Sequence, residues 1–225
     1  MGNWLTYSPS DFLLFTPHTY YRLFELYNRA VWPLHPVAFV LGFALLVLLL
    51  RSGVWRGRAI AAILAVCWLW VAWAYLYERY DTINWAARYF AIAFAAEAVL
   101  LIVSGVLMNR LTPGADPLNR AGAAIVAFAL LVQPLFAPLF GRPWLQMEFF
   151  GLAPDPTVAA TFGALLTMRR APWPLFVIPL LWCAVTGATL WAMQAPDALL
   201  MPAIAVLAIG LAVRKACAPV SLSRH

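Results

Sequence analysis

The sequence predicts an all-α, polytopic membrane helix bundle of about seven transmembrane helices, preceded by an N-terminal amphipathic helix at the membrane interface. Hydrophobic residues make up 64% of the 225 residues and charged residues 11%, and the mean hydropathy is +0.82. Soluble domains are closer to half apolar and a quarter charged. Long apolar runs separated by short polar loops complete the pattern of a multi-pass chain.

Residues 1–32 are predicted to form an external N-terminal segment. Thr16-Pro17 is typical of a helix N-cap followed by the first helical residue. Apolar and aromatic residues then recur at helical spacing, at Tyr20, Leu23, Phe24, Tyr27 and Val31. On the opposite face, Glu25 and Arg29 are predicted to form an ion pair. We expect this helix to anchor the chain in the lipid bilayer, and it is also the surface through which other membrane subunits could dock.

The predicted transmembrane bundle covers residues 33–215, and residues 216–225 form a predicted cytoplasmic tail. Gln133-Pro134 and Pro138 predict a bend in the later half of the fourth span, because proline removes a backbone donor. Small residues four apart, such as Ala159 and Gly163, favour close contact between helices. The seven predicted spans are residues 33–50, 59–77, 85–108, 121–140, 157–168, 175–193 and 198–213.

The fifth predicted span is too short to cross a bilayer easily. Asp155 is predicted as its N-cap and Pro156 as its first helical residue. Thr157 to Met168 would extend about 18 Å at 1.5 Å per residue, whereas the hydrocarbon core is about 30 Å thick. This helix is therefore either a short, tilted span under a packed loop or a span whose start faces a polar cavity below the membrane surface.

The distribution of basic residues predicts how the chain is oriented in the membrane. If all seven segments cross, ten of the 15 basic residues fall on the side of the C-terminus. The positive-inside rule then places the N-terminus outside and the C-terminus in the cytoplasm. A re-entrant fifth segment would place Arg169 and Arg170 outside, so the seven-span arrangement is preferred. Seven of the nine acidic residues are then external, and we expect any binding site to face outward.

Five residues are candidate ligand-binding groups. Glu97 lies near the middle of the third span, where a carboxylate costs about 2.5–3.5 kcal/mol unless it is neutral, paired or wetted. The structural alternative is a protonated Glu97 that is hydrogen-bonded to a neighbouring helix, for instance at Gln133 or at a backbone carbonyl freed by a proline. Arg88 either joins an outer charge cluster with Glu78, Asp81 and Asp155 or extends its side chain to the membrane surface. The complete candidate set is Glu97, Gln133, Arg88, Asp155 and Trp68.

Several functions lack a signature in this sequence. It has no GxSxG element, no phosphate-binding loop and no GxGxxG motif, so no catalytic residue is assigned and an enzyme is disfavoured. The three cysteines form no CxxC pair and the three histidines are scattered, so no metal site and no cofactor are predicted. The net charge of +6 contains no basic run, so nucleic acid is not an expected partner.

Three stretches carry a family resemblance. The segment before the first span has the sequence TYYRLFELYNRAVWP, the second span is rich in Trp, and FGLAPDPT is followed by LFVIPLLW. Over about Tyr20 to Leu207, the chain resembles a bacterial family of multi-pass membrane proteins known only as a domain of unknown function. The resemblance implies an integral protein of the bacterial inner membrane. It brings no reaction, substrate or catalytic residues with it.

Two functional hypotheses remain. The first is a protein that binds or transports a small solute through an outward-facing polar cavity, supported by the bent fourth span and the short fifth helix. The second is an accessory or scaffold subunit of a larger membrane complex, supported by the lack of catalytic motifs and by the aromatic N-terminal helix.

Overall fold

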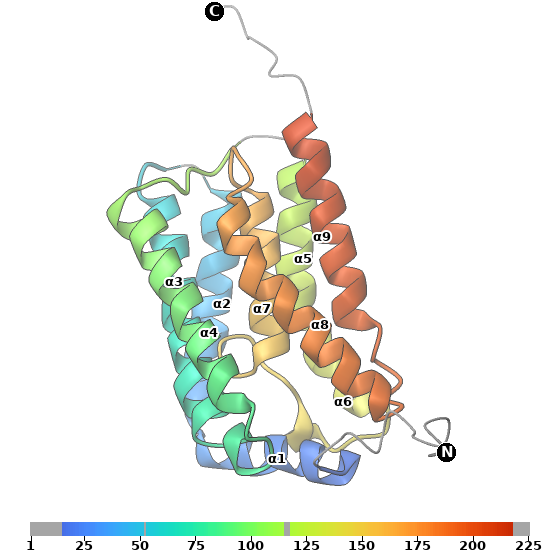
Figure 1. Cartoon of the computed structure of the whole chain (residues 1–225). Helices are drawn as coiled ribbons and strands as arrows, with labels where there is room; N and C mark the ends of the chain where they lie inside the picture. Colours follow the sequence, from blue (N-terminus) through green and yellow to red (C-terminus); the bar gives the residue numbers. More distant parts are fainter. Residues whose placement is uncertain (1–14, 52, 115–117, 218–225) are drawn as a thin grey trace, which may run out of the picture.

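The described chain is a bundle of helices with one further helix lying across its end. The computed structural model describes residues 15–51, 53–114 and 118–217, and within these ranges the regular structure is helical. The N-terminal 14 residues, the Asp116-Pro117 turn and the end of the predicted tail lie outside the described residues. In Figure 1, α1 runs across the lower end of the bundle, and α9 ends at the opposite end. The α-helices are α1 (Pro17–Ala30), α2 (Leu34–Leu50), α3 (Arg56–Trp70), α4 (Ala87–Leu101), α5 (Leu118–Leu131), α6 (Phe136–Leu139), α7 (Pro154–Leu166), α8 (Val177–Ala192) and α9 (Leu200–Cys217).

Several of these helices are suited to a membrane. Five continuous helical segments are long and apolar enough to cross a bilayer, and there are six if α1 and α2, which meet at 95°, count as one broken span. A multi-pass membrane protein follows from these apolar helices. With 13 residues, α7 is not among them. Helix length in the described residues thus supports five or six spans. The five segments are Arg56–Thr82, Ala87–Leu107, Asn119–Leu139, Trp173–Ala192 and Leu200–Cys217.

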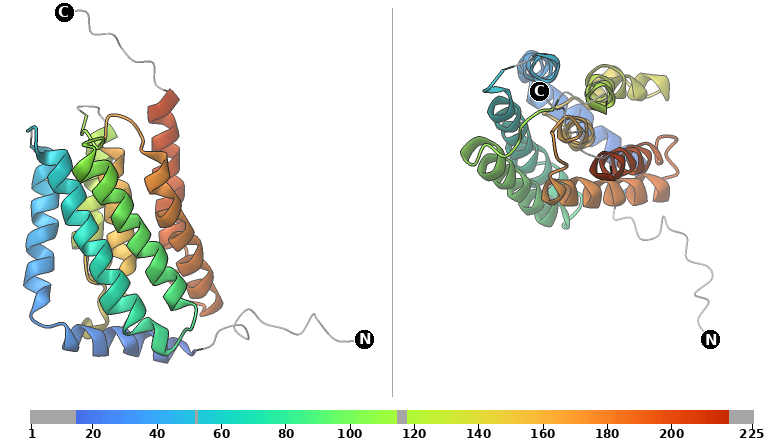
Figure 2. Two further views of the ribbon diagram at one scale, coloured as in Figure 1. Left: turned by 60° about the vertical axis from the view of Figure 1, so that its left-hand side comes forward. Right: turned by 90° about the horizontal axis from the view of Figure 1, so that it is seen from above.

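The first helix begins as the sequence predicts and buries its apolar face within its own chain. The Thr16 hydroxyl accepts a hydrogen bond from the Thr19 backbone N–H at 3.2 Å, and Pro17 occupies the first turn. The Tyr27 hydroxyl accepts a hydrogen bond from the Trp70 indole at 3.0 Å, which ties α1 to α3. As Figure 2 shows, α1 closes one end of the bundle. The buried apolar residues of α1 are Tyr20, Leu23, Phe24 and Tyr27.

The segment formed by α5 and α6 is broken where the sequence predicts a bend in the fourth span. Regular α-helix stops at Leu131, and a 3₁₀ turn over Gln133–Leu135 leads into the short α6. Pro134 has no backbone N–H, so the α-helical hydrogen-bond ladder is interrupted at this point. Two other breaks have no clear sequence signal. The ends of the α3 and α4 segments continue as π-helix over Val71–Tyr77 and Ile102–Leu107.

The short helix α7 lies at the centre of the bundle. Every residue from Phe150 to Met168 is buried, and in the end-on view of Figure 2 the other long helices surround it. Its closest neighbour is α5, where Gly122 and Gly163 bring the two backbones together. A Cβ added at either glycine would lie 2.5 Å from the carbonyl oxygen of the other. This contact therefore requires glycine on both sides.

The far end of α7 is tied to the loop that precedes α5. Gly114 donates its backbone N–H to the Thr167 carbonyl, and Arg169 donates to the Thr112 carbonyl, both at 2.8 Å. The Lys215 ammonium of α9 donates to the Leu166 carbonyl at 2.8 Å. A cation at the C-terminal end of a helix is stabilised by the free carbonyls and by the helix dipole. These contacts fix α7 at the end opposite α1.

We predict that Gly163→Ala destabilises the protein and that Gly210→Ala does not. A Cβ at residue 163 would also meet the Val126 backbone nitrogen at 2.9 Å, whereas a Cβ at Gly210 in α9 would meet nothing within 4 Å. Overpacking of this kind typically costs about 1–3 kcal/mol. Thermal unfolding of the detergent-purified variants measures the difference. Equal melting temperatures for the two variants would contradict the close α5–α7 contact.

Candidate functional site

Asp155 is buried at the start of α7, but it does not cap the helix. The N-cap is Ala153, and Pro154 takes the first turn, so the prediction of an Asp155 cap followed by Pro156 was wrong by two residues. The carboxylate instead accepts hydrogen bonds from two side chains of α8, the Trp182 indole at 2.7 Å and the Thr186 hydroxyl at 3.1 Å. Because α8 supplies these donors, the carboxylate can be buried without acting as a backbone cap.

A small polar cavity lies beside Asp155. Its volume is about 10 Å³, which corresponds to the space of about one water molecule. Leu190, Leu200 and Met201 form part of its apolar wall. Its polar lining comes from the α5–α6 break, the loop before α7, the start of α7 and the turn before α9. The polar lining residues are Gln133, Arg142, Glu148, Asp155 and Asp197.

An ion pair borders this cavity. The Arg142 guanidinium lies 3.0 Å from the Asp197 carboxylate, and these side chains are 12% and 10% exposed. The guanidinium carbon also lies 4.2 Å from the centre of the Tyr21 ring on α1, a cation–π distance. Arg142 is thus held both by the turn before α9 and by the helix across the end of the bundle.

Three buried polar atoms around the cavity lack a hydrogen-bond partner among the described residues. They are Gln133 Oε1, Arg142 Nη1 and Asp197 Oδ1. The Gln133 amide nitrogen faces only the Met201 sulfur, at 3.6 Å. Unpaired buried polar atoms are costly and indicate an occupant or a functional role. A cation with N–H donors would satisfy the two unpaired oxygens, whereas the Arg142 nitrogen is a donor and needs an acceptor, such as a water molecule.

The cavity is rich in carboxyl groups. Glu148, Asp155 and Asp197 face one guanidinium, that of Arg142. Removal from water, and then the negative charge of Asp155, hold the pKa of the Glu148 carboxyl well above its usual range, although Arg142 opposes the shift. Burial, followed by the Asp197 carboxylate, raises the pKa of Tyr21 to about 12. An additional positive charge in the cavity would offset the excess of carboxylates.

Two of the five candidate residues, Gln133 and Asp155, meet at this cavity, and Glu97 does not. Glu97 is fully buried in α4, and neither of its carboxylate oxygens has a hydrogen-bond partner among the described residues. The alternative in which Glu97 bonds to Gln133 is therefore not what the structure contains. Glu97 is an isolated polar group in the interior of the bundle.

Arg88 and Trp68 also lie elsewhere. Arg88 donates to both carboxylate oxygens of Asp81 at 2.9 Å, and its side chain is 68% exposed. Of the predicted outer charge cluster, the structure contains the pair of Arg88 and Asp81. Asp155 is not bonded to this pair, because its hydrogen bonds come from Trp182 and Thr186 of α8. Trp68 is buried and donates to the Thr161 hydroxyl at 2.8 Å. Its ring also contacts Phe94, which in turn contacts Trp182, a donor to Asp155.

Sequence reasoning did not select Arg142, Glu148 and Asp197 as site residues. All three occupy predicted external loops, and the excess of acidic residues on that side was the available signal. This excess of acidic residues could not show that the loops fold inward over the start of α7. The described residues contain no group of three or more His, Cys, Asp or Glu side chains arranged to hold a metal ion.

Comparison with known proteins gives the family but no activity. Residues 17–221 match the model of a family described as a family of unknown function, DUF6064. No curated protein and no solved structure shows a significant match to the chain. The matched segment covers nearly all of the described bundle, including α1 and the cavity beside α7. The chain is therefore a member of the DUF6064 family of unknown function.

Proposed function

We propose that this protein is an integral membrane protein that binds a small, positively charged solute in the cavity beside Asp155. The observation that supports the proposal most directly is the pair of buried, unpaired acceptor oxygens, Gln133 Oε1 and Asp197 Oδ1, at a cavity lined by three carboxyl groups. A buried site with more carboxylates than basic groups attracts cations. The small volume favours an ion of about the size of ammonium.

The ion pair between Arg142 and Asp197 is the proposed closure of this site. It joins the loop before α7 to the turn between α8 and α9, two segments that are 55 residues apart in sequence. Because both side chains are largely buried, separating them would expose charged groups and open the cavity. Uptake of a cation beside Asp197 would compensate for the loss of the Arg142 contact. This arrangement supports binding, and transport through the bundle would require a further site.

We further propose that α2, α3, α4, α5, α7, α8 and α9 together cross a bacterial inner membrane, with the N-terminus outside and the C-terminus in the cytoplasm. The charge distribution supports this orientation. The shortness of α7 is compatible with a crossing because its neighbours, rather than lipid, surround it. In this arrangement α1 lies in the outer interface, and the cavity beside Asp155 is near the external surface.

An accessory role in a larger membrane complex remains the competing proposal. The apolar face of α1 is already buried against its own chain, so a partner at this helix would have to bind its polar side. Extraction in mild detergent, followed by mass analysis of co-purifying chains, separates the two ideas. A stoichiometric partner chain would support the subunit role, whereas a chain without partners that binds cations would support the proposed site.

We predict that ammonium stabilises the detergent-purified protein in a saturable manner. A ligand present at a hundred times its dissociation constant raises the free energy of unfolding by about 2.7 kcal/mol. Ammonium chloride is titrated against choline chloride at constant ionic strength while thermal unfolding is recorded. Choline is too large for the cavity and controls for salt effects.

Asp155→Asn and Asp197→Asn should abolish this stabilisation, while the matched variant Asp81→Asn should retain it. Asp81 is also an ion-paired carboxylate, but its partner is the exposed Arg88, and it does not line the cavity. The proposed site is wrong if ammonium, sodium and potassium all fail to stabilise the wild type, or if all three variants behave alike.

We predict that cation affinity rises as the pH is raised above the usual range of a carboxyl pKa. The raised pKa of Glu148 means that its carboxyl retains a proton above its usual range, and this proton competes with a bound cation. Loss of the proton at higher pH therefore strengthens binding. Glu148→Gln should reduce the pH dependence, and the exposed Glu78→Gln should leave it unchanged. A cation affinity that falls as the pH rises would contradict the proposed role of the Glu148 carboxyl.

We predict that an impermeant maleimide labels Cys217 only after the membrane of intact cells is made permeable. Cys217 is exposed near the end of α9, whereas Cys67 and Cys183 are buried. The expected location of the α9 end is the cytoplasm, where the reagent cannot reach it in intact cells. Cys217→Ser controls for labelling at the other two cysteines. Labelling of Cys217 in intact cells would reverse the proposed orientation.

A further inference from the structure

A second, larger depression lies at the corner between α1 and α2. It has a volume of about 570 Å³ and is formed by the end of α1, the first turns of α2 and the loop before α7. We call this depression the corner groove. Its walls are largely aromatic, and its polar lining residues are Asn28, Arg29 and His35. The aromatic lining residues are Trp32, Phe39, Trp144 and Phe149.

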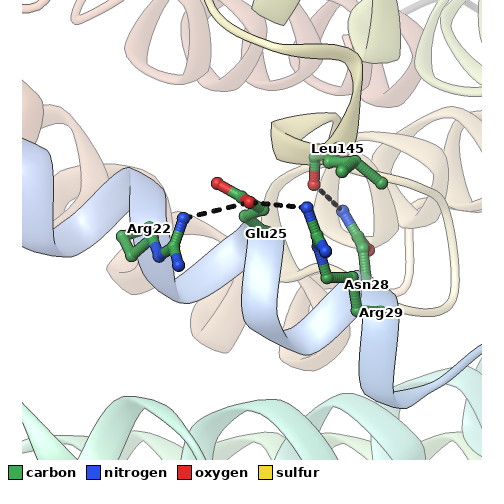
Figure 3. A network of polar contacts seen from close by, with 5 residues as sticks. All are labelled: Arg22, Glu25, Asn28, Arg29 and Leu145. Carbon is green, nitrogen blue, oxygen red and sulfur yellow. Dashed lines mark hydrogen bonds and ion pairs between the residues drawn. The ribbon is translucent and has the colours of Figure 1, made fainter.

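Asn28 holds the wall of the corner groove in place. It is buried on α1, and its amide nitrogen donates to the carbonyls of Leu145 and Met147, both at 2.8 Å. Figure 3 shows this side chain reaching the Leu145 carbonyl beside Arg29. One amide thus fixes a loop more than 100 residues away in sequence, and the groove is a constructed feature of the fold.

The same amide determines the hydrogen-bonding state of His35. Because both carbonyls accept from the Asn28 nitrogen, its amide oxygen remains as an acceptor, and it lies 3.3 Å from His35 Nε2. His35 Nε2 must therefore carry the proton, which leaves Nδ1 of the neutral ring as an acceptor. His35 is 8% exposed, and Nδ1 is buried with no partner among the described residues. The site lacks one hydrogen-bond donor.

The mouth of the corner groove carries a positive charge. Arg29 contacts the Glu25 carboxylate through one nitrogen at 3.0 Å, and its side chain is 61% exposed. Figure 3 shows Glu25 between Arg22 and Arg29. A guanidinium has five N–H donors, so the Glu25 contact leaves donors available for a phosphate. Trp32, which is 67% exposed, lies beside His35 with ring centroids 5.7 Å apart, and both residues line the corner groove.

The wall of the corner groove that α2 forms continues into a surface suited to an acyl chain. Large apolar side chains are exposed at helical spacing along α2, from the groove away from α1, as expected for a face that contacts lipid. A molecule with a polar head between Arg29 and His35 and an apolar tail along α2 would match both parts. The exposed apolar residues of this α2 face are Phe39, Phe43, Val47 and Leu50.

We infer that the corner groove binds one phospholipid whose headgroup combines a phosphate with a hydrogen-bond donor. The phosphate lies at Arg29, the donor reaches His35 Nδ1, and an acyl chain follows the apolar face of α2. Phosphatidylethanolamine meets these requirements. Phosphatidylcholine has the same phosphate and the same chains, but its trimethylated nitrogen has no N–H to donate.

Native mass spectrometry of the full chain in detergent tests this assignment with two probes, dioleoyl phosphatidylethanolamine and dioleoyl phosphatidylcholine. We expect one tightly bound phosphatidylethanolamine per chain, with about tenfold weaker binding of phosphatidylcholine because one hydrogen bond from a charged donor is lost. Equal binding of the two lipids to the wild type would overturn the inference, and this comparison requires no substitution.

Three variants locate the lipid. His35→Phe should remove the preference between the two lipids, and Arg29→Gln should weaken binding of both by about fivefold. Arg22→Gln is the matched control, because Arg22 is also on α1 and also contacts Glu25, at 3.1 Å, but does not line the corner groove. Equal losses for Arg22→Gln and Arg29→Gln would indicate general attraction to lipid and overturn the inference. Cross-linking of a co-purifying protein to residue 144 would also overturn the inference, because a protein would then occupy the groove.

Discussion

The close contact between α5 and α7 is the constraint on which the remaining structure depends. Gly122 and Gly163 allow the two backbones to approach more closely than any side chain would permit. This contact places α7 in the middle of the bundle, where every residue from Phe150 to Met168 is buried. A helix in this position needs no lipid-facing length, because protein surrounds it. Its 13 residues are therefore sufficient for its place in the fold.

A central helix that starts inside the protein creates unsatisfied polar groups, and the neighbouring segments have to satisfy them. The Thr157 hydroxyl accepts from the Gly151 N–H and donates to the Ala153 carbonyl, which closes the turn before the helix. Trp182 and Thr186 of α8 satisfy the Asp155 carboxylate. Three of the remaining unpaired buried atoms, on Gln133, Arg142 and Asp197, lie at the cavity beside Asp155, which is the proposed cation site.

The polar end of the bundle thus contains two proposed sites of different character. The cavity beside Asp155 is small, enclosed and acidic, and it suits a small ion. The corner groove is large, open and aromatic, and it suits an amphipathic lipid. The loop before α7 contributes to both, because Arg142 and Glu148 line the cavity while Trp144 and Phe149 line the groove. Glu97 belongs to neither, and its two unpaired oxygens have no explanation in the described contacts.

The sequence by itself determined the features that depend on local chemistry and composition. The apolar runs predicted a helical membrane protein, Thr16-Pro17 predicted the start of α1, and Pro134 predicted the break after α5. Tertiary structure decided which polar residues meet. Glu97 and Gln133 share the polar character of a site, but they do not bond, whereas Arg142 and Asp197 are 55 residues apart and form an ion pair. Local periodicity cannot encode such long-range pairs, because they depend on how loops fold over the end of a central helix.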